Sequence, residues 1–242
     1  MKKFGIILFG LGMLLAQPVA AQIAPALPDQ GTVKYTYNNP GQYQGASFGG
    51  IYVGPYAGTL RAIGGNPTDA AMSLYCVDFF NFAVQGQVVA AVVSNLDGGN
   101  TSLARLGASG LESYKKTAFL SSLFQTYGSI GQFSGLSQTQ AWSGIHAAIW
   151  YFTSGEVGRY TSASYLSAFR DYATDNYLNY NGFHQWSVLT TMSVGGNPLW
   201  ASQEFLVQTQ GLPRLTQVPQ VPPTVTPEPQ TYGLMLSGLI FL

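Results

Sequence analysis

The order in which strand-like and helix-like patterns follow one another constrains the fold of this chain more than any other feature. Runs rich in β-branched and aromatic residues come first, at 32–37, 51–53, 73–82 and 87–93. Apolar residues then recur at helical spacing through the middle of the chain, before two more strand-like runs at 186–192 and 204–207. Strands followed by helices and then strands predict an α+β domain, with helices packed on an antiparallel sheet or barrel.

Three helices are predicted in the middle of the chain. Residues 109–112 have the spacing of a capping box, in which a hydroxyl and a carboxylate satisfy free amides at a helix start, and Gly128 can end that helix. A second capping-box pattern at 137–140 precedes residues 141–152, which are apolar on nearly every side and therefore predict a buried helix. Apolar residues within 166–173 indicate the third helix.

The chain is weakly charged but rich in aromatic residues. Only 8% of the 242 residues are charged and the formal net charge is zero, so a basic surface for nucleic acid is not expected. Cys76 is the one cysteine, so no intramolecular disulfide can form and an apolar core must supply the stability. The two histidines and Cys76 lack the paired spacing of a zinc site, and neither a metal nor a cofactor is expected.

The amino-terminal residues have the layout of a secretory signal peptide. Two lysines precede an uncharged apolar run at 4–15, and small residues at 19–21 suit signal peptidase. The run is shorter than the roughly 20 apolar residues that span a bilayer. We therefore expect residues 1–21 to be removed by cleavage between Ala21 and Gln22, and the domain from 22 to 211 to be exported.

The carboxyl-terminal residues show a second change of composition. A Pro-rich linker is predicted at 212–226, and an apolar run closes the chain after Pro227, Glu228 and Pro229. This arrangement at 227–242 resembles the PEP-CTERM sorting signal, truncated because the family's closing cluster of arginines does not follow. The resemblance implies recognition by exosortase, an integral-membrane enzyme of Gram-negative bacteria that make exopolysaccharide. It also implies transient contact with the inner membrane, followed by retention at the cell surface or in the extracellular matrix.

Two interior motifs lie on different predicted elements. Tyr75-Cys76-Val77 falls in a strand, and Ala148-Ile149-Trp150 falls in the buried helix. Together they resemble the bacterial thioester domains, adhesin modules with a Tyr-Cys-hydrophobic motif and a glutamine two residues ahead of Ala-Ile-Trp. In that family the Cys and Gln side chains condense to an internal thioester, which traps amines on a host target. This sequence has His146 where the resemblance places the glutamine.

Histidine has no carboxamide carbon to acylate a thiol, so Cys76 and His146 would form a degenerate thioester pair. The leading hypothesis is therefore a non-enzymatic surface or matrix protein that adheres to, or organises, extracellular polysaccharide. A covalent adhesin that joins Cys76 to another glutamine stays open. Gln138 and Gln140 are near His146 in sequence, but about two helical turns earlier, roughly 9 to 12 Å away.

A secreted Cys/His hydrolase is the second alternative. In it, His146 would activate the Cys76 thiol, and Asp78 or Thr139 would orient the imidazole ring. Trp142, His146 and Trp150 recur at i, i+4 and i+8, which is more simply interpreted as a stripe of core residues. An enzyme is therefore not expected.

Aromatic residues near the start of the domain suggest a polysaccharide contact. Tyrosine faces can stack on sugar rings, although tyrosine is also a common strand residue. The tyrosines concerned are Tyr35, Tyr37, Tyr43, Tyr52 and Tyr56.

Overall fold

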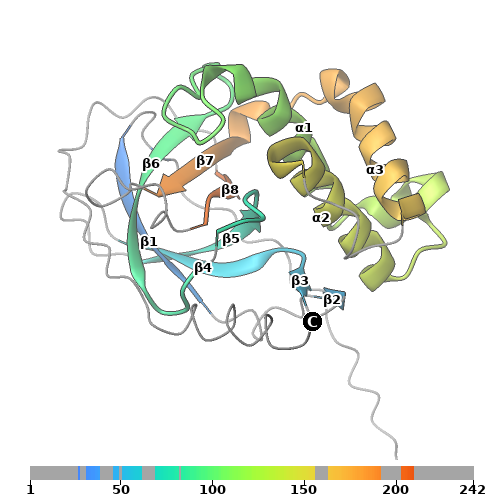
Figure 1. The fold of residues 1–242 in the computed structure, drawn as a ribbon, viewed down its shortest axis with the longest axis horizontal. Helices are drawn as coiled ribbons and strands as arrows, with labels where there is room; N and C mark the ends of the chain where they lie inside the picture. Colours follow the sequence, from blue (N-terminus) through green and yellow to red (C-terminus); the bar gives the residue numbers. More distant parts are fainter. Residues whose placement is uncertain are drawn as a thin grey trace, which may run out of the picture.

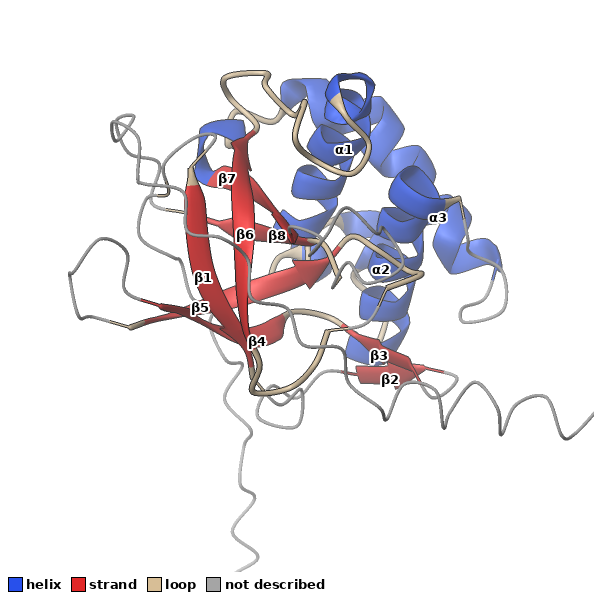
Figure 2. Ribbon diagram, turned by 60° about the vertical axis from the view of Figure 1, so that its left-hand side comes forward, coloured by secondary structure: helices blue, strands red, loops and turns tan. Residues whose placement is uncertain are grey.

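The part of the chain that the structure describes folds into a β-barrel with three α-helices. Figures 1 and 2 show from two directions that these helices pack on one side of the barrel. The computed structural model describes residues 27, 31–38, 46–48, 51–61, 69–81, 83–155, 163–191 and 203–209. This architecture confirms the predicted α+β class. The proposed signal cleavage at Ala21 and Gln22, the Pro-rich linker and the motif at 227–229 lie outside the described residues.

Six antiparallel strands close the barrel in the order β1-β4-β5-β8-β7-β6, and β1 pairs with β6 to complete it. The barrel strands are β1 Thr32–Tyr37, β4 Tyr56–Arg61, β5 Ala70–Cys76, β6 Val88–Asn95, β7 Trp186–Thr191 and β8 Phe205–Gln208. A separate two-stranded sheet pairs β2 Ala46–Phe48 with β3 Ile51–Val53. β8 comes last among the described strands, yet it lies between β5 and β7.

The pairing of β5 with β8 places two distant parts of the chain together. Cys76, the last residue of β5, is opposite Phe205, the first residue of β8. The pairing continues past both strand ends, where the Val77 amide donates to the Glu204 carbonyl at 3.1 Å. Residues just before β8 therefore lie beside residues at the end of β5.

The helices are α1 Leu111–Ser122, α2 Gln138–Ser154 and α3 Ala163–Asn176. α2 contacts both other helices and the small sheet. Trp142, His146 and Trp150 are all buried along it, which agrees with the predicted buried helix. No helix among the described residues is long and apolar enough to cross a membrane.

Only one of the two predicted capping boxes forms. α2 begins with the reciprocal bonds of Ser137 and Gln140, and it ends at Gly155 in the left-handed conformation. The prediction for residues 109–112 was wrong, because a 3₁₀ turn at 108–110 precedes α1 and no side chain caps the helix. The hydroxyl of Ser109 instead donates to the Leu106 carbonyl, which lies ahead of that turn. α1 also ends at Ser122, before the expected Gly128, in a further series of turns.

Two strand predictions needed correction. The run at 73–82 stops as a strand at Cys76, because the Asp78 carboxylate accepts the Phe80 amide and forms a turn. β4 was missed, since Gly58 interrupts its strand-like pattern. The structure shows why glycine is there: a Cβ at Gly58 would lie 2.7 Å from the side chain of Leu74 on β5.

Candidate functional site

The Cys76 thiol is fully buried and lies among three polar groups. The Trp150 indole donates to Sγ at 3.3 Å, the Gln203 amide nitrogen lies 2.6 Å from Sγ, and the thiol donates to the Asp78 carbonyl at 3.4 Å. Burial raises the pKa of the thiol to about 12, although the hydrogen bonds with Trp150 and the Asp78 backbone lower it. Cys76 is therefore a neutral thiol at neutral pH.

Gln203 is the carboxamide beside the sulfur. Its Nε2 also donates to the Asp78 carbonyl at 3.0 Å, which fixes the amide across the end of β5. Because the amide C–N bond is about 1.33 Å long, the Cδ of Gln203 lies within about 3.9 Å of Sγ. This upper limit is only slightly longer than the 3–3.5 Å of a near-attack arrangement between a nucleophile and an acyl carbon.

The sequence placed the expected glutamine position at His146, and in the structure a different side chain lies beside the sulfur. His146 is near Cys76, but it contacts the backbone: Nε2 donates to the Cys76 carbonyl at 3.2 Å. Its Nδ1 accepts the Gly54 amide at 2.8 Å. The carboxamide at the sulfur comes from Gln203, two residues before β8, and not from α2.

The same bonds argue against the Cys/His hydrolase. Burial lowers the pKa of His146 to about 3, so the ring is neutral, and both of its nitrogens are bonded to backbone groups. Neither nitrogen remains to accept the thiol proton of Cys76. Asp78 and Thr139 do not orient the ring: the Asp78 carboxylate binds the turn that follows it, and Thr139 is exposed.

Gln138 and Gln140 lie far from the thiol. They begin α2, whereas Trp150 lies twelve residues beyond Gln138, a rise of about 18 Å at 1.5 Å per residue. Gln140 caps the helix and donates to the Tyr165 hydroxyl at 2.8 Å. Neither glutamine can reach Cys76.

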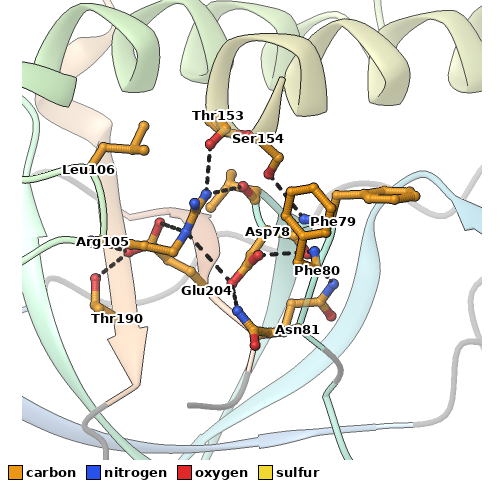
Figure 3. Close-up of polar contacts among 12 residues, drawn as sticks. Asp78, Phe79, Phe80, Asn81, Arg105, Leu106, Thr153, Ser154, Thr190 and Glu204 are labelled. Carbon is orange, nitrogen blue, oxygen red and sulfur yellow. Dashed lines mark hydrogen bonds and ion pairs between the residues drawn. The ribbon is translucent and has the colours of Figure 1, made fainter. Parts of the chain in front are cut away.

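Three charged residues lie close to Cys76 and Gln203. We call these residues, Asp78, Arg105 and Glu204, the buried ion cluster (Figure 3). The Nε of Arg105 is 3.6 Å from the Asp78 carboxylate and 3.8 Å from the Glu204 carboxylate. Both carboxylate side chains are 2% exposed, so Arg105 is the counter-ion that makes their burial tolerable. Asp78 follows Cys76 by two residues, and Glu204 directly follows Gln203.

The cluster also connects several elements of the fold (Figure 3). The Arg105 guanidinium donates to the carbonyls of Val77, at 3.1 Å, and of Thr153 near the end of α2, at 2.9 Å. Glu204 accepts the hydroxyls of Thr190 and Tyr114, each at 2.6 Å. Burial raises the pKa of Glu204, while these hydroxyl donors act in the opposite direction. The cluster thereby holds the ends of β5, β8 and α2 in place.

The structure offers little support for the sugar-stacking tyrosines. Tyr35 and Tyr56 are buried in the core and present no free face, so this part of the expectation was wrong. Tyr37 is half-buried and stacks on Phe205, whereas Tyr52 is 49% exposed. Tyr43 lies outside the described residues. Within the described part of the chain, no group of three His, Cys, Asp or Glu residues could hold a metal ion.

The fold and site define an α+β barrel domain in which a buried cysteine and a half-buried glutamine lie together at one end of two adjacent strands. A solved structure with a similar fold is the N-terminal thioester domain of a protein F2-like fibronectin-binding protein from Streptococcus pneumoniae. The similarity is distant, with a TM-score of 0.43 and 11% sequence identity over 78% of this chain and 99% of that one. No family model and no curated protein matches the sequence.

Proposed function

We propose that this chain is an exported adhesion module in which Cys76 and Gln203 condense to an internal thioester that captures an amine. The observation that carries the proposal is the 2.6 Å contact between Sγ and the amide nitrogen of Gln203. It replaces the degenerate pair that the sequence indicated with a complete one, and so favours the covalent alternative over a module without chemistry.

Condensation needs only these two side chains. Sγ forms a bond to Cδ of Gln203, the Cδ–Nε2 bond breaks, and the thiol proton leaves with the nitrogen as ammonia. Capture of a target reverses the pattern, because the target amine forms a C–N bond to Cδ while the C–S bond breaks and Sγ takes up the amine's proton. Each molecule reacts once, so the module is not an enzyme in this proposal.

Burial makes such a bond durable. Cys76 has no exposed surface and Gln203 is half-buried, so bulk water has little access to the acyl carbon. A thioester in this position would persist until an amine is bound beside it. The proposed partner is therefore a surface or matrix component with accessible amino groups.

Sorting to the surface belongs to the same proposal. The signal-peptide layout of residues 1–21 supports processing by signal peptidase. The resemblance of 227–242 to a PEP-CTERM signal supports processing by exosortase and delivery to the exopolysaccharide matrix of a Gram-negative bacterium. Changing Pro227 and Pro229 to alanine together should release the protein from the surface fraction into the medium. Unchanged surface retention would contradict the sorting step alone.

Intact-mass measurement of the purified domain tests the thioester. We expect the wild-type mass to be lower than that calculated from the sequence by one ammonia, about 17 Da, and methylamine to add to this species. The variants Cys76→Ala and Gln203→Ala should show no such loss, whereas Gln140→Ala should keep it. A wild-type protein of unmodified mass, whose Cys76 thiol reacts with a thiol reagent once the protein is denatured, would refute the proposal.

A further inference from the structure

Trp150 makes a contact with the reacting sulfur that condensation would leave intact. Among the described residues, two side-chain N–H donors reach Sγ, from Gln203 and from Trp150. The Gln203 nitrogen departs as ammonia when the thioester forms. The Trp150 indole, at 3.3 Å, is then the side-chain donor that remains on the sulfur.

The indole is held firmly in this position. Its ring stacks on His146 one turn earlier on α2, with centroids 4.5 Å apart, and it meets the edge of Phe79 at 5.0 Å. His146 is itself fixed by its bonds to the Gly54 amide and the Cys76 carbonyl. Two side chains of α2 therefore hydrogen-bond to Cys76: His146 to its carbonyl and Trp150 to its sulfur.

The surroundings of Sγ are poor at stabilising negative charge. The thiol is fully buried, so a negative charge on Sγ is not solvated by bulk water, and burial raises the pKa of the group. A hydrogen bond to a developing charge is stronger in such a low-dielectric site than in water. A fixed donor aimed at the sulfur is therefore placed where it can influence the reaction rate most.

We propose that Trp150 is a catalytic residue of the amine-capture step, in which its indole N–H stabilises the negative charge that gathers on Sγ as the C–S bond breaks. The amine nitrogen supplies the electron pair of the new C–N bond, and the pair of the C–S bond moves to Sγ. The sulfur then takes the proton released by the amine. This role rests on the thioester proposed above.

The chain provides a matched control on the same helix. Trp142 is also buried, and its indole donates to the Phe124 carbonyl at 2.9 Å, away from the sulfur. Trp150→Phe and Trp142→Phe remove the same atoms from the same helix. A loss caused only by poorer packing should therefore affect both variants, whereas loss of the donor to sulfur affects Trp150→Phe alone.

The test measures the rate at which methylamine adds to the thioester form of each variant, followed by intact mass. We expect Trp150→Phe to react at least about tenfold more slowly than wild type, and Trp142→Phe to react within about twofold of it. Should Trp150→Phe fail to fold, benzothienylalanine at position 150 keeps the indole shape without its N–H, and the same slowing is expected.

Three outcomes would overturn the role of Trp150. The first is equal rates for the two phenylalanine variants, and the second is a benzothienylalanine protein that reacts like wild type. The third is faster reaction with water or methylamine in Trp150→Phe, which would show that the ring only shields the bond. A wild-type protein without the loss of about 17 Da refutes the thioester itself, and the role with it, so the two failures are distinguishable.

Discussion

At the scale of single residues, His146 shows how a buried histidine can join three segments without any acid–base chemistry. The ring accepts the Gly54 amide and donates to the Cys76 carbonyl, so it connects α2 to the end of β5 and to the residue after β3. The chain at Gly54 passes so close to α2 that a Cβ there would lie 2.4 Å from the Trp142 ring. These bonds require one neutral tautomer, with the proton on Nε2.

This requirement gives a pH dependence of stability. Burial lowers the pKa of His146 from 6.5 to about 3, so between these values the unfolded chain binds a proton that the folded chain does not. The free energy of unfolding should therefore fall as the pH decreases from about 6.5 toward 3. Glu204, with a raised pKa, acts in the opposite direction above its ordinary value of 4.5, so the effect of His146 must be isolated by substitution.

Urea unfolding of wild type and His146→Gln between pH 4 and 7 isolates the contribution of His146 to the pH dependence of stability. The stability advantage of wild type over the variant should shrink with decreasing pH, by up to about 1.4 kcal/mol per pH unit within the window. His184, which is exposed, provides the control substitution His184→Gln. Parallel pH profiles for wild type and His146→Gln would contradict this account.

At the scale of elements, local signals were predictable and pairing was not. The capping box at Ser137 and Gln140 is complete in four residues, so α2 could be located from the sequence alone. The strand that bears Cys76 was likewise recognisable from its composition. The neighbour of that strand was not, because β8 begins 129 residues later at Phe205 and nothing local specifies its partner.

This explains why Gln203 was missed. It lies directly before the predicted run at 204–207, so its place in the chain was visible, but its place opposite Cys76 depends on strand order in the barrel. The resemblance directed attention to α2 instead, where His146 meets the carbonyl of Cys76 and not the sulfur. Knowledge of the β5–β8 pairing would have been enough to identify the glutamine.

The buried ion cluster makes the stability of the β5–β8 pairing depend on one residue, Arg105. Replacing Arg105 by methionine leaves the Asp78 and Glu204 carboxylates buried without a counter-ion and removes the bonds to two carbonyls. We expect a loss of about 3–5 kcal/mol in the free energy of unfolding, together with a smaller fraction of thioester. Chemical denaturation and intact mass measure the two effects.

A surface pair provides the control for Arg105. Arg61 pairs with Asp69 where both side chains are about 40% exposed, and Arg61→Met should cost less than about 1 kcal/mol. Adding Glu204→Gln to Arg105→Met should restore part of the stability, because it removes one of the uncompensated charges. If Arg105→Met proved as stable as Arg61→Met, the cluster would not organise the site.

At the scale of the whole molecule, Cys76 and Gln203 lie where the barrel and the helical layer meet. β5 supplies Cys76 and the segment just before β8 supplies Gln203. α2 supplies His146 and Trp150, which hydrogen-bond to Cys76, and the Thr153 carbonyl, which accepts from Arg105. A bond between Cys76 and Gln203 would close a loop of 127 residues across this junction. It would therefore act as a cross-link of the fold as well as a reactive group.

The effect of this cross-link on stability should be measurable as a change in Tm. Closing a loop of this length restricts the unfolded chain, as a disulfide does, and contributes about 2–4 kcal/mol. Opening it with methylamine should therefore lower Tm by roughly 5–15 °C, at about 2–4 °C per kcal/mol for a domain of this size. Gln203→Ala, which has no thioester to open, should show no change in Tm on the same treatment. An equal decrease in both proteins would mean that methylamine acts on the fold by another route, whereas a decrease in wild type alone would connect the chemistry at Cys76 to the stability of the barrel.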